Sequence, residues 1–355
     1  MIEILDRFDP ETLGRFDEII DVRSPAEFAL DHVPGAVNLP VLGDAERAEV
    51  GTLYVQVSRL QARVAGAALV ARNIARHLEG PLARKSGGFA PLVYCWRGGQ
   101  RSNAMASVLS QVGWRVTLLA GGYKTYRRWV RSRLYEGDPK LDVVLLDGDT
   151  GSAKTEILRG LAERGVQSLD LEALADHRGS LFGALPGRAQ PSQKLFETRL
   201  AAALENLDPL RPVVVEAESS KIGDLIVPPL LWKAMAAAPR IELRASARER
   251  ARYLVGAYGD IIEDRERLAA IISSLPVHHA RKARQKWLDL AAAGAFEALA
   301  LALIEAHYDP AYRRSMAGEG RASLGVITLD DLGPESQDRA AEAVAELVTQ
   351  RSAPA

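Results

Sequence analysis

The sequence lacks the features that mark secreted, membrane-spanning and disulfide-stabilised proteins. Its 355 residues contain one cysteine, which excludes an internal disulfide and fits a reducing cytosol. The longest apolar stretches, such as residues 64–71, are too short to cross a bilayer. The N-terminus shows no charged start followed by an apolar core, so we expect no export and a cytoplasmic protein.

The sequence also has no excess of charge of either sign. Lys and Arg number 45 against 46 Asp and Glu, a formal net charge of −1. A nucleic-acid partner would therefore have to be attracted by local basic patches and not by the charge of the whole chain. The length suits two domains better than one.

The lone cysteine opens the run Cys95-Trp96-Arg97-Gly98-Gly99-Gln100-Arg101-Ser102, which follows the apolar stretch 91–94 and precedes a helical stretch over 102–112. Backbone N–H groups of a tight glycine loop, a helix start and the Arg97 and Arg101 guanidinium groups all favour a thiolate over a thiol. We interpret Cys95 as a nucleophile; a buried structural cysteine is the alternative.

This loop resembles the active-site loop of rhodanese-type sulfurtransferases. The upstream runs Asp21-Val22-Arg23-Ser24-Pro25-Ala26-Glu27-Phe28 and Asp31-His32-Val33-Pro34-Gly35 look like the rhodanese signature, and the resemblance covers residues 1 to about 135. In physical terms the signature is structural. Residues 19–22 suit a short buried strand, Pro25 begins a helix, and Pro34-Gly35 forms a turn. We expect Asp21 and Arg23 to form an ion pair of the framework.

The first block of the chain alternates strands and helices. The sequence predicts strands over 18–22, 92–95 and 115–119 and an amphipathic helix over 60–78, whose apolar stripe comprises Leu60, Val64, Ala67, Ala68, Ile74 and Leu78. It also predicts a polar helix over 123–135. Glu136-Gly137-Asp138-Pro139 breaks the last helix, and we place a domain boundary there.

The second block restarts the α/β alternation. Strands are expected over 141–147, 213–217 and 240–244, an almost wholly helical part from about 247 to 310, a linker over 317–320, an apolar stretch over 325–329 and a helix from about 337. We therefore predict an α/β chain: a rhodanese-like domain over 1–135, a P-loop NTPase-like parallel-sheet domain with a helical C-terminal part over 136–316, and a tail over 317–355.

A second chemical motif joins the strand 141–147 to a helix: Gly148-Asp149-Thr150-Gly151-Ser152-Ala153-Lys154-Thr155. In this context successive backbone N–H groups cradle phosphate, Lys154 supplies charge, and Thr155 can bind Mg²⁺. Ala153 stands where such loops have glycine, and alanine disfavours positive φ. The alternative is a glycine-rich turn that only starts a helix. We predict diphosphate contacts from Gly148, Thr150, Gly151, Ser152, Lys154 and Thr155.

Charged side chains follow the next two strands. Glu216 and Glu218 end the strand over 213–217 and would face one side if it stays extended, to hold Mg²⁺ or orient a substrate. An exposed strand end is the alternative. Arg248 and Arg252 share a helical face and could clamp anionic oxygens, although a solvated helix explains them too.

Further runs connect the two halves. Asp170-Leu171-Glu172-Ala173-Leu174-Ala175-Asp176-His177-Arg178-Gly179-Ser180, Gln190-Pro191-Ser192-Gln193-Lys194 and Glu216-Ala217-Glu218-Ser219-Ser220-Lys221 have no simple periodicity. With Gly51-Thr52-Leu53-Tyr54 and Tyr308-Asp309-Pro310, they resemble the tRNA 2-selenouridine synthase family, to about residue 315.

The resemblance implies an enzyme that converts wobble 2-thiouridine of tRNA to 2-selenouridine through S-geranyl-2-thiouridine. Geranyl diphosphate and selenophosphate would be cosubstrates, with no tightly bound cofactor. The resemblance leaves open whether Mg²⁺ and a selenophosphate-supplying enzyme take part. Cys95 would accept or deliver selenium while Arg97 and Arg101 hold the anionic donor. The phosphate loop would grip the diphosphate with help from Arg178 and Arg248, and His177 would transfer protons or serve structure.

The tRNA needs phosphate contacts and access to an unstacked base. Two basic stretches suit this, although charged helix faces are usually only solvated. The expected contacts are Arg127, Arg128 and Arg131, interleaved with Tyr126 and Trp129, and Arg281, Lys282, Arg284 and Lys286. Just before the second stretch the family has a Lys-Arg-Leu-Gly run where this chain has Val277-His278-His279-Ala280.

Two other functions remain open at this stage. A small-molecule kinase fused to a sulfurtransferase would share both motifs. A degenerate rhodanese docking module would be non-enzymatic, but it would not need an intact cysteine loop.

Overall fold

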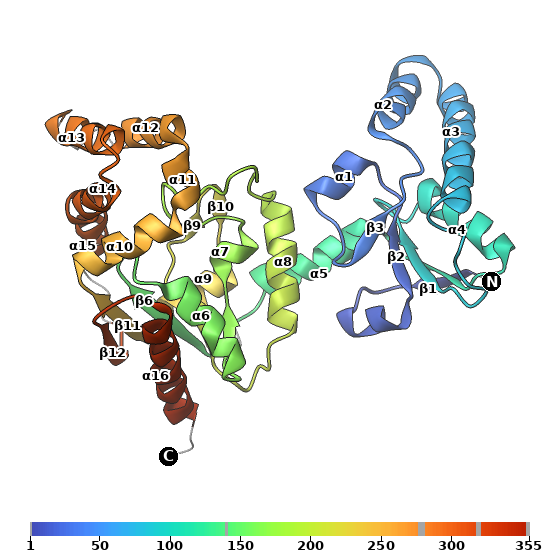
Figure 1. Cartoon of the computed structure of the whole chain (residues 1–355). Coiled ribbons are helices and arrows are strands. Elements are labelled where there is room, and N and C mark those ends of the chain that lie inside the picture. The colour runs from blue at the N-terminus through green and yellow to red at the C-terminus, as the bar shows by residue number, and fades with distance from the viewer. Residues whose placement is uncertain (1, 139–140, 276–280, 317–320, 353–355) are drawn as a thin grey trace. The chain divides into compact units, whose positions relative to one another are not determined.

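The computed structural model describes residues 2–138, 141–275, 281–316 and 321–352, which divide into two compact units (Figure 1). The N-terminal unit comprises Met1–Glu136 and Pro191–Glu205, and the C-terminal unit comprises Gly137–Gln190 and Asn206–Ala355. The end of the expected boundary at Pro139, the run at 277–280 and the expected linker over 317–320 lie outside the described residues.

The N-terminal unit is built on a five-stranded parallel sheet of order β1-β5-β4-β2-β3. The strands are β1 (Ile2–Leu5), β2 (Glu18–Asp21), β3 (Ala36–Asn38), β4 (Pro91–Tyr94) and β5 (Val116–Leu119). All residues of β4 and β5 are buried, as expected for strands covered on both faces. The three predicted strands are confirmed, and the structure adds β1 and β3.

Helices of the N-terminal unit surround this sheet. They are η1 (Pro10–Arg15), α1 (Pro25–Leu30), α2 (Asp44–Thr52), η2 (Leu53–Val57), α3 (Arg59–Glu79), α4 (Gln100–Val112), α5 (Tyr123–Tyr135) and α8 (Gln193–Glu205). The signature elements are as predicted: Pro25 begins α1, and Gly35 adopts a φ of 75° in the turn before β3. Asp21 and Arg23 form a buried ion pair at 2.6 Å.

The predicted helix over 60–78 is confirmed as α3, and so is the second half of its apolar stripe, where Ile74 is buried and Leu78 packs against the core. The first half of the predicted buried face is wrong. Leu60 and Val64 are 70% and 64% exposed. The buried residues are Ala62, Gly66, Asn73 and Ile74. In the first half the small residues Ala62 and Gly66 face inward because α2 packs closely there, and a Cβ at Gly66 would lie 3.3 Å from Val50 Cγ1.

Helix α8 belongs by its contacts to the N-terminal unit, although it was expected in the second domain. It packs on α5, where the fully buried Tyr126 donates from its hydroxyl to Thr198 Oγ1 at 3.0 Å. Phe8 and Trp129 pack against Tyr126 with ring centroids at 4.8 and 6.0 Å. The phosphate-loop part of the chain therefore contributes a helix to the core of the first unit.

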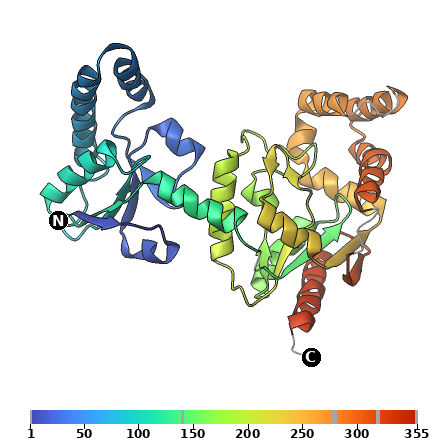
Figure 2. The ribbon, with the colours of Figure 1, turned by 180° about the vertical axis from the view of Figure 1, so that it is seen from behind.

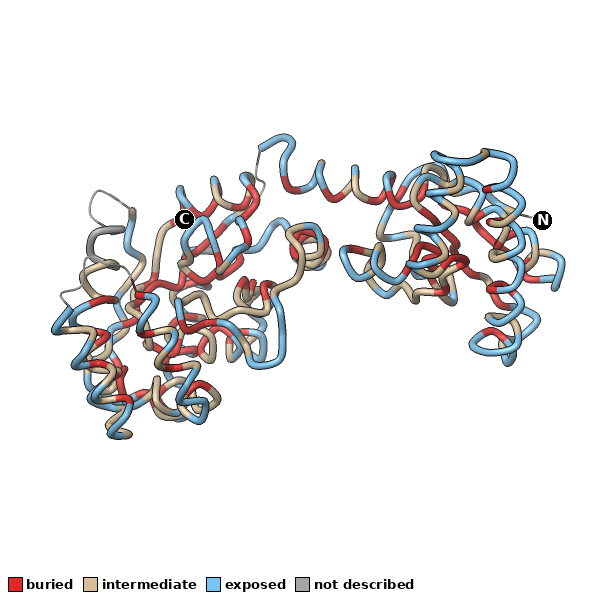
Figure 3. Tube along the Cα trace, turned by 90° about the horizontal axis from the view of Figure 1, so that it is seen from above, coloured by how far each residue is buried: buried red, intermediate tan, exposed pale blue. Residues whose placement is uncertain are grey.

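The C-terminal unit has a second five-stranded parallel sheet, of order β12-β11-β6-β8-β7. Its strands are β6 (Val143–Gly148), β7 (Gln167–Leu169), β8 (Val213–Glu216), β11 (Arg240–Ala245) and β12 (Ser323–Leu329), and β9 (Lys221–Ile222) and β10 (Leu225–Ile226) form a small antiparallel pair. The predicted strands over 141–147, 213–217 and 240–244 are confirmed. The strands β4, β6 and β8 are wholly buried, and Figure 3 shows buried segments in red within each unit.

The expectation of a separate tail over 317–355 is wrong. Strand β12 pairs in parallel with β11, and helix α16 (Pro334–Ser352) packs on α6 (Lys154–Glu163). Figure 2 shows α16 beside the sheet from behind. Leu329 and Val344 belong to the apolar core of the unit together with Val144 and Ile157. Burial of these side chains is favourable because it removes apolar surface from water.

The predicted helical part is confirmed. The remaining helices of the C-terminal unit are α7 (Leu171–Leu174), α9 (Pro229–Ala237), α10 (Ala247–Ala257), α11 (Gly259–Glu263), α12 (Arg265–Ser274), α13 (Arg281–Ala292), α14 (Phe296–Leu303), η3 (Ile304–Tyr308) and α15 (Asp309–Met316). From α11 to α14 they enclose a core of their own around Trp287, which is 1% exposed. Within the described residues, none of the helices has the length and apolar character needed to cross a membrane.

Candidate functional site: a thiolate loop and a phosphate loop

Cys95 lies directly after β4, at the carboxyl edge of the first sheet. Its carbonyl oxygen accepts from the Tyr123 N–H at 2.8 Å, so the cysteine loop and the start of α5 pack backbone to backbone. Gly98 and Gly122 have φ of 66° and 57° there. A Cβ at Gly122 would lie 2.7 Å from the Gly98 nitrogen and overlap the Cys95 carbonyl, so this position requires glycine.

The sulfur of Cys95 is the acceptor of a local hydrogen-bond network. Sγ accepts from the Gly99 N–H at 3.2 Å and from the Ser102 hydroxyl at 3.1 Å. Burial alone would raise the pKa of the thiol, but the hydrogen bonds from Ser102, Arg97 and Gly99 outweigh it and hold the pKa below its usual value. The geometry therefore stabilises a thiolate, the nucleophilic form of cysteine.

The two arginines of this loop have different environments. Arg101 donates to Glu27 Oε2 at 2.8 Å and is 21% exposed, whereas Arg97 is exposed. Burial acts to raise the pKa of Glu27, but Arg101 and Arg47 lower it below its usual value. Arg97 is thus the freer guanidinium for an anionic donor, and Arg101 is already committed to Glu27.

The phosphate loop runs from the end of β6 to the start of α6, as the sequence predicts. Ala153 adopts the left-handed conformation with φ 58°, where such loops have glycine. This conformation costs alanine roughly 1–2 kcal/mol. The loop therefore keeps its conformation in spite of the backbone strain at Ala153. Lys154 Nζ donates to the Gly148 carbonyl at 2.8 Å. The loop borders a cleft of about 660 Å³, which we call the phosphate cleft.

Most of the predicted diphosphate contacts line this cleft. They are Gly148, Thr150, Gly151, Ser152, Lys154, Thr155 and Arg178. Gly151 packs closely against Leu254 of α10, since a Cβ at Gly151 would lie 2.9 Å from Leu254 Cγ. All residues of the loop except Asp149 thus line one cavity large enough for a diphosphate ester.

Arg248 is exposed and does not line the cleft, contrary to its predicted role. Arg250, two residues later, is 3% exposed and donates to the Thr150 carbonyl at 3.1 Å and to both Asp309 oxygens at 2.9 and 2.8 Å. Arg252 pairs with Glu249 at the surface. The helical register of α10 turns Arg250 toward the loop, and its neighbours outward.

Three glutamates meet beside Lys154 and Thr155. The Thr155 hydroxyl donates to Glu216 Oε1 at 2.9 Å, and Glu172 Oε2 lies 3.3 Å from the same hydroxyl. Glu218 lines the cleft, and a Cβ at Gly179 would lie 2.8 Å from its Oε1. The chain turns after Glu216, with the Glu218 N–H donating to the Glu216 carbonyl at 2.9 Å, and does not stay extended.

Burial raises the pKa of all three carboxyl groups, and mutual repulsion adds to it for Glu172 and Glu216. Among the described residues, no group of three or more His, Cys, Asp or Glu is arranged to hold a metal ion by itself. Glu216 Oε2 is buried without a hydrogen-bond partner in the described structure. Glu216 and Thr155 therefore fit a Mg²⁺ ion that takes its other ligands from phosphate and water.

Arg178 and His177 come from the segment after α7. Arg178 Nη1 donates to Asp260 Oδ1 at 2.9 Å, and its guanidinium lies 4.8 Å from the Tyr258 ring centroid. Burial lowers the pKa of His177, although Asp224 acts in the opposite direction. His177 lines the phosphate cleft as a mainly neutral imidazole, the form that can accept a proton.

Some of the expected tRNA-binding side chains are exposed, and others already have partners within the protein. Arg128, Arg131, Arg281, Lys282 and Lys286 are exposed. Arg127 is paired with Glu197, and Arg284 donates to the Leu275 carbonyl at 2.8 Å. Tyr126 is fully buried, so it cannot stack on a base as the interleaved pattern suggested.

Sequence reasoning missed Ser102, Glu172 and Arg250. Ser102 lies one helical turn after Gly98, a spacing that points its hydroxyl back toward the loop. Glu172 lies in the run that was singled out without a role. Only the packing of α10 against the phosphate loop distinguishes Arg250 from the arginines beside it.

Comparison with known protein families finds a match in each half of the chain. The family described as rhodanese-like domain matches residues 6–128, and the family described as tRNA 2-selenouridine synthase AAA domain matches residues 141–271. Three proteins named tRNA 2-selenouridine synthase illustrate the curated relatives.

The relative from Chromohalobacter salexigens is 38% identical over 63% of this chain and 60% of its own length. The relative from Aeromonas salmonicida is 39% identical over 66% of this chain and 62% of its own length. The chain thus spans about 60% of these relatives. The relative from Cupriavidus pinatubonensis is 35% identical over 69% of this chain and 68% of its own length. With these matches and both loops present, the chain belongs to the tRNA 2-selenouridine synthase family.

Proposed function

We propose that this chain is a transferase that converts the wobble 2-thiouridine of tRNA to 2-selenouridine through S-geranyl-2-thiouridine. The observation that carries the proposal is the presence, in one chain of this family, of a stabilised thiolate loop and an intact phosphate loop. Geranyl diphosphate and selenophosphate are the proposed cosubstrates, and the proposed setting is the cytoplasm.

The first step is assigned to the phosphate cleft. The thiouridine sulfur attacks C1 of geranyl diphosphate, a C–S bond forms, and the C–O bond to the diphosphate breaks. Lys154 and the loop N–H groups bind the diphosphate and stabilise its charge as it leaves. Mg²⁺, when bound by Thr155 and Glu216, neutralises part of the same charge. A phosphate loop is thereby used without ATP hydrolysis.

The second step is assigned to the cysteine loop. A thiocarbonyl sulfur is a poor leaving group, whereas the alkylated sulfur departs as a neutral thiol, so geranylation prepares C2 for selenium. Water cleaves the P–Se bond of selenophosphate and phosphate leaves; the selenide forms a bond to C2 while the C2–S bond breaks and geranylthiol leaves. Cys95 takes part in this selenium delivery as a thiolate, and the exposed Arg97 attracts the anionic selenophosphate. Arg101 orients the loop through Glu27.

The tRNA is held by local positive charge, because the net charge of the chain is close to zero. The exposed Arg128 and Arg131 of α5 and the exposed Arg281, Lys282 and Lys286 of α13 are the proposed phosphate contacts. An unstacked anticodon base is the proposed target.

Mass spectrometry of tRNA nucleosides tests the proposal. Thiolated tRNA is incubated with geranyl diphosphate and selenophosphate, separately and together, and S-geranyl-2-thiouridine and 2-selenouridine are quantified. Both products should form, the second only when both donors are present or after prior geranylation. Absence of both products with folded protein would refute the function, and ATP turnover without tRNA would support a kinase instead.

Two variants test the division of labour. Cys95→Ser should abolish 2-selenouridine while S-geranyl-2-thiouridine still forms, because the thiolate lies outside the phosphate cleft. Lys154→Ala should reduce geranylation by at least tenfold, since a charge-assisted contact contributes about 1.5–3 kcal/mol. Loss of both steps in Cys95→Ser, or unchanged geranylation in Lys154→Ala, would contradict these roles.

A further inference from the structure

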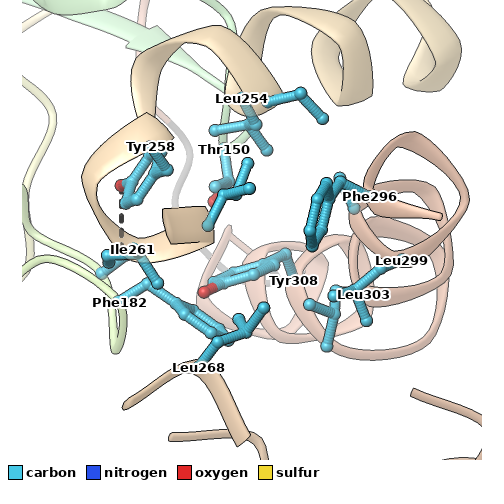
Figure 4. Close-up of a pocket in the computed structure, with 14 residues that line it drawn as sticks. Thr150, Phe182, Leu254, Tyr258, Ile261, Leu268, Phe296, Leu299, Leu303 and Tyr308 are labelled. Carbon is cyan, nitrogen blue, oxygen red and sulfur yellow. Dashed lines mark hydrogen bonds between the residues drawn. The ribbon is translucent and has the colours of Figure 1, made fainter. Parts of the chain in front are cut away.

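A second cavity of about 70 Å³ lies among the helices α10, α11, α12 and α14 of the C-terminal unit (Figure 4). We call it the apolar cavity. The residues that line only this cavity are all hydrocarbon side chains: Phe182, Val255, Ile261, Ile262, Leu268, Phe296, Leu299, Ala300 and Leu303. Such a lining excludes charged or strongly hydrated ligands.

The apolar cavity adjoins the phosphate cleft. Five residues line both: Thr150, Ser180, Leu254, Tyr258 and Tyr308. Thr150 belongs to the phosphate loop, and Leu254 lies against Gly151 of the same loop. Figure 4 shows Thr150 and Leu254 next to each other at the top of the view, with Tyr308 below them among the apolar side chains. A ligand whose anionic end is held by the loop can therefore extend its other end into the apolar cavity.

The polar atoms at this junction do not suit a nucleoside. The hydroxyl groups of Ser180 and Tyr258 are hydrogen-bonded to each other at 3.1 Å. Tyr308 is half-buried, and its hydroxyl also interacts with the Ser180 side chain. A purine base needs partners for its ring nitrogens and exocyclic groups, and the lining that belongs to the apolar cavity alone provides hydrocarbon surface instead.

We infer that the apolar cavity binds the far end of an isoprenoid chain whose diphosphate lies on the phosphate loop. This inference rests on the proposed function and deepens it by assigning the tail of the prenyl diphosphate to a site. An apolar cavity of about 150 Å³ holds a benzene ring. A volume of about 70 Å³ therefore takes the three or four carbons at the branched end of the last isoprene unit. The nearer carbons lie in the wider phosphate cleft.

Donors of different tail length test the inference on the unmodified protein. The ligands are inorganic pyrophosphate and dimethylallyl, geranyl and farnesyl diphosphate, with affinity measured by calorimetry. Each buried methylene strengthens binding about fourfold, so three or four carbons predict about a hundredfold tighter binding of geranyl diphosphate than of pyrophosphate. Affinities of all four ligands within about threefold of one another would overturn the inference.

Two variants of one helix locate the effect. Ala300 lines the apolar cavity from α14 and is half-buried, whereas Ala298 of the same helix is exposed and lines neither cavity. Ala300→Phe should fill the cavity and weaken geranyl diphosphate binding about a hundredfold, with pyrophosphate binding unchanged. Ala298→Phe should change neither. Full affinity of Ala300→Phe for geranyl diphosphate would place the tail elsewhere and overturn the inference.

The tail site and the proposed function fail in different measurements. If Ala300→Phe is misfolded, as seen by circular dichroism, the tail-length series on the unmodified protein decides the question by itself. If the unmodified protein binds geranyl diphosphate a hundredfold tighter than pyrophosphate but forms no S-geranyl-2-thiouridine, the tail site is supported and the tRNA reaction is refuted. If the modified nucleoside forms while tail length has no effect on affinity, the reaction stands and the tail site is overturned.

Discussion

Replacing Ser102 by alanine should raise the pKa of the Cys95 thiol. The Ser102 hydroxyl is fully buried and donates to Sγ at 3.1 Å. The substitution removes this donor and keeps nearly the same shape, while the Gly99 N–H at 3.2 Å remains. The change therefore isolates one of the contacts that oppose the effect of burial.

The size of the shift follows from the strength of a hydrogen bond to a charged acceptor. Such a bond contributes about 1.5–3 kcal/mol, and one pKa unit corresponds to about 1.4 kcal/mol. We expect a rise of about 1 to 2 units. Where the pKa lies above the pH of the measurement, the thiolate fraction should fall about tenfold or more.

The absorbance of the thiolate at 240 nm, followed against pH, measures this pKa directly. The chain has one cysteine, so the Cys95→Ser variant gives the background from all other groups. Ser110→Ala on the same helix, two turns farther from the sulfur, is the matched control and should leave the titration unchanged. A Ser102→Ala titration that superimposes on that of the unmodified protein would refute the role assigned to the hydroxyl.

Two further predictions concern stability. Burial and the charge of Glu216 raise the pKa of Glu172 to about 9, against 4.5 for an ordinary glutamate, so this group favours the folded state at low pH and that contribution is lost as pH rises toward 9. Glu172→Gln should accordingly melt at the same temperature as the unmodified protein near pH 4 and higher near pH 9; an equal difference at both pH values would contradict the raised pKa. Gly122→Ala should lower the free energy of unfolding by more than about 2 kcal/mol, because positive φ and a clash with Gly98 act together. Gly35→Ala, at φ 75° with open space around it, is the control for φ alone in urea denaturation, and equal losses in both variants would exclude the clash.

Local patterns in the sequence were sufficient to predict the cysteine loop and the phosphate loop. A buried parallel strand followed by a glycine-rich turn and a helix has few possible conformations, so the positions of Cys95 and Lys154 at sheet edges follow from the chain itself. The positive φ at Ala153 was also foreseeable, since the loop type requires it whichever residue is present. The strands β2, β4, β5, β6, β8 and β11 were predicted from their short apolar runs.

Features that depend on contacts with residues far away in the chain could not be predicted from the sequence. The apolar residues Leu60 and Val64 suggested the wrong face of α3, because the inward face was set by close packing on α2. The sequence predicted Arg127 as a phosphate contact, but in the structure it forms an ion pair with Glu197 of α8. No local signal announces a partner 70 residues later in the chain.

The sequence by itself determined which chemical groups this protein carries and which local turns present them, because those depend on residues within one strand–loop–helix unit. Only the tertiary structure decided which arginine supports the phosphate loop, that β12 and α16 complete the second sheet, and that a hydrocarbon cavity adjoins the phosphate cleft. These features arise from side chains brought together by packing of segments far apart in the chain, and burial and pairing energies act only once those segments meet.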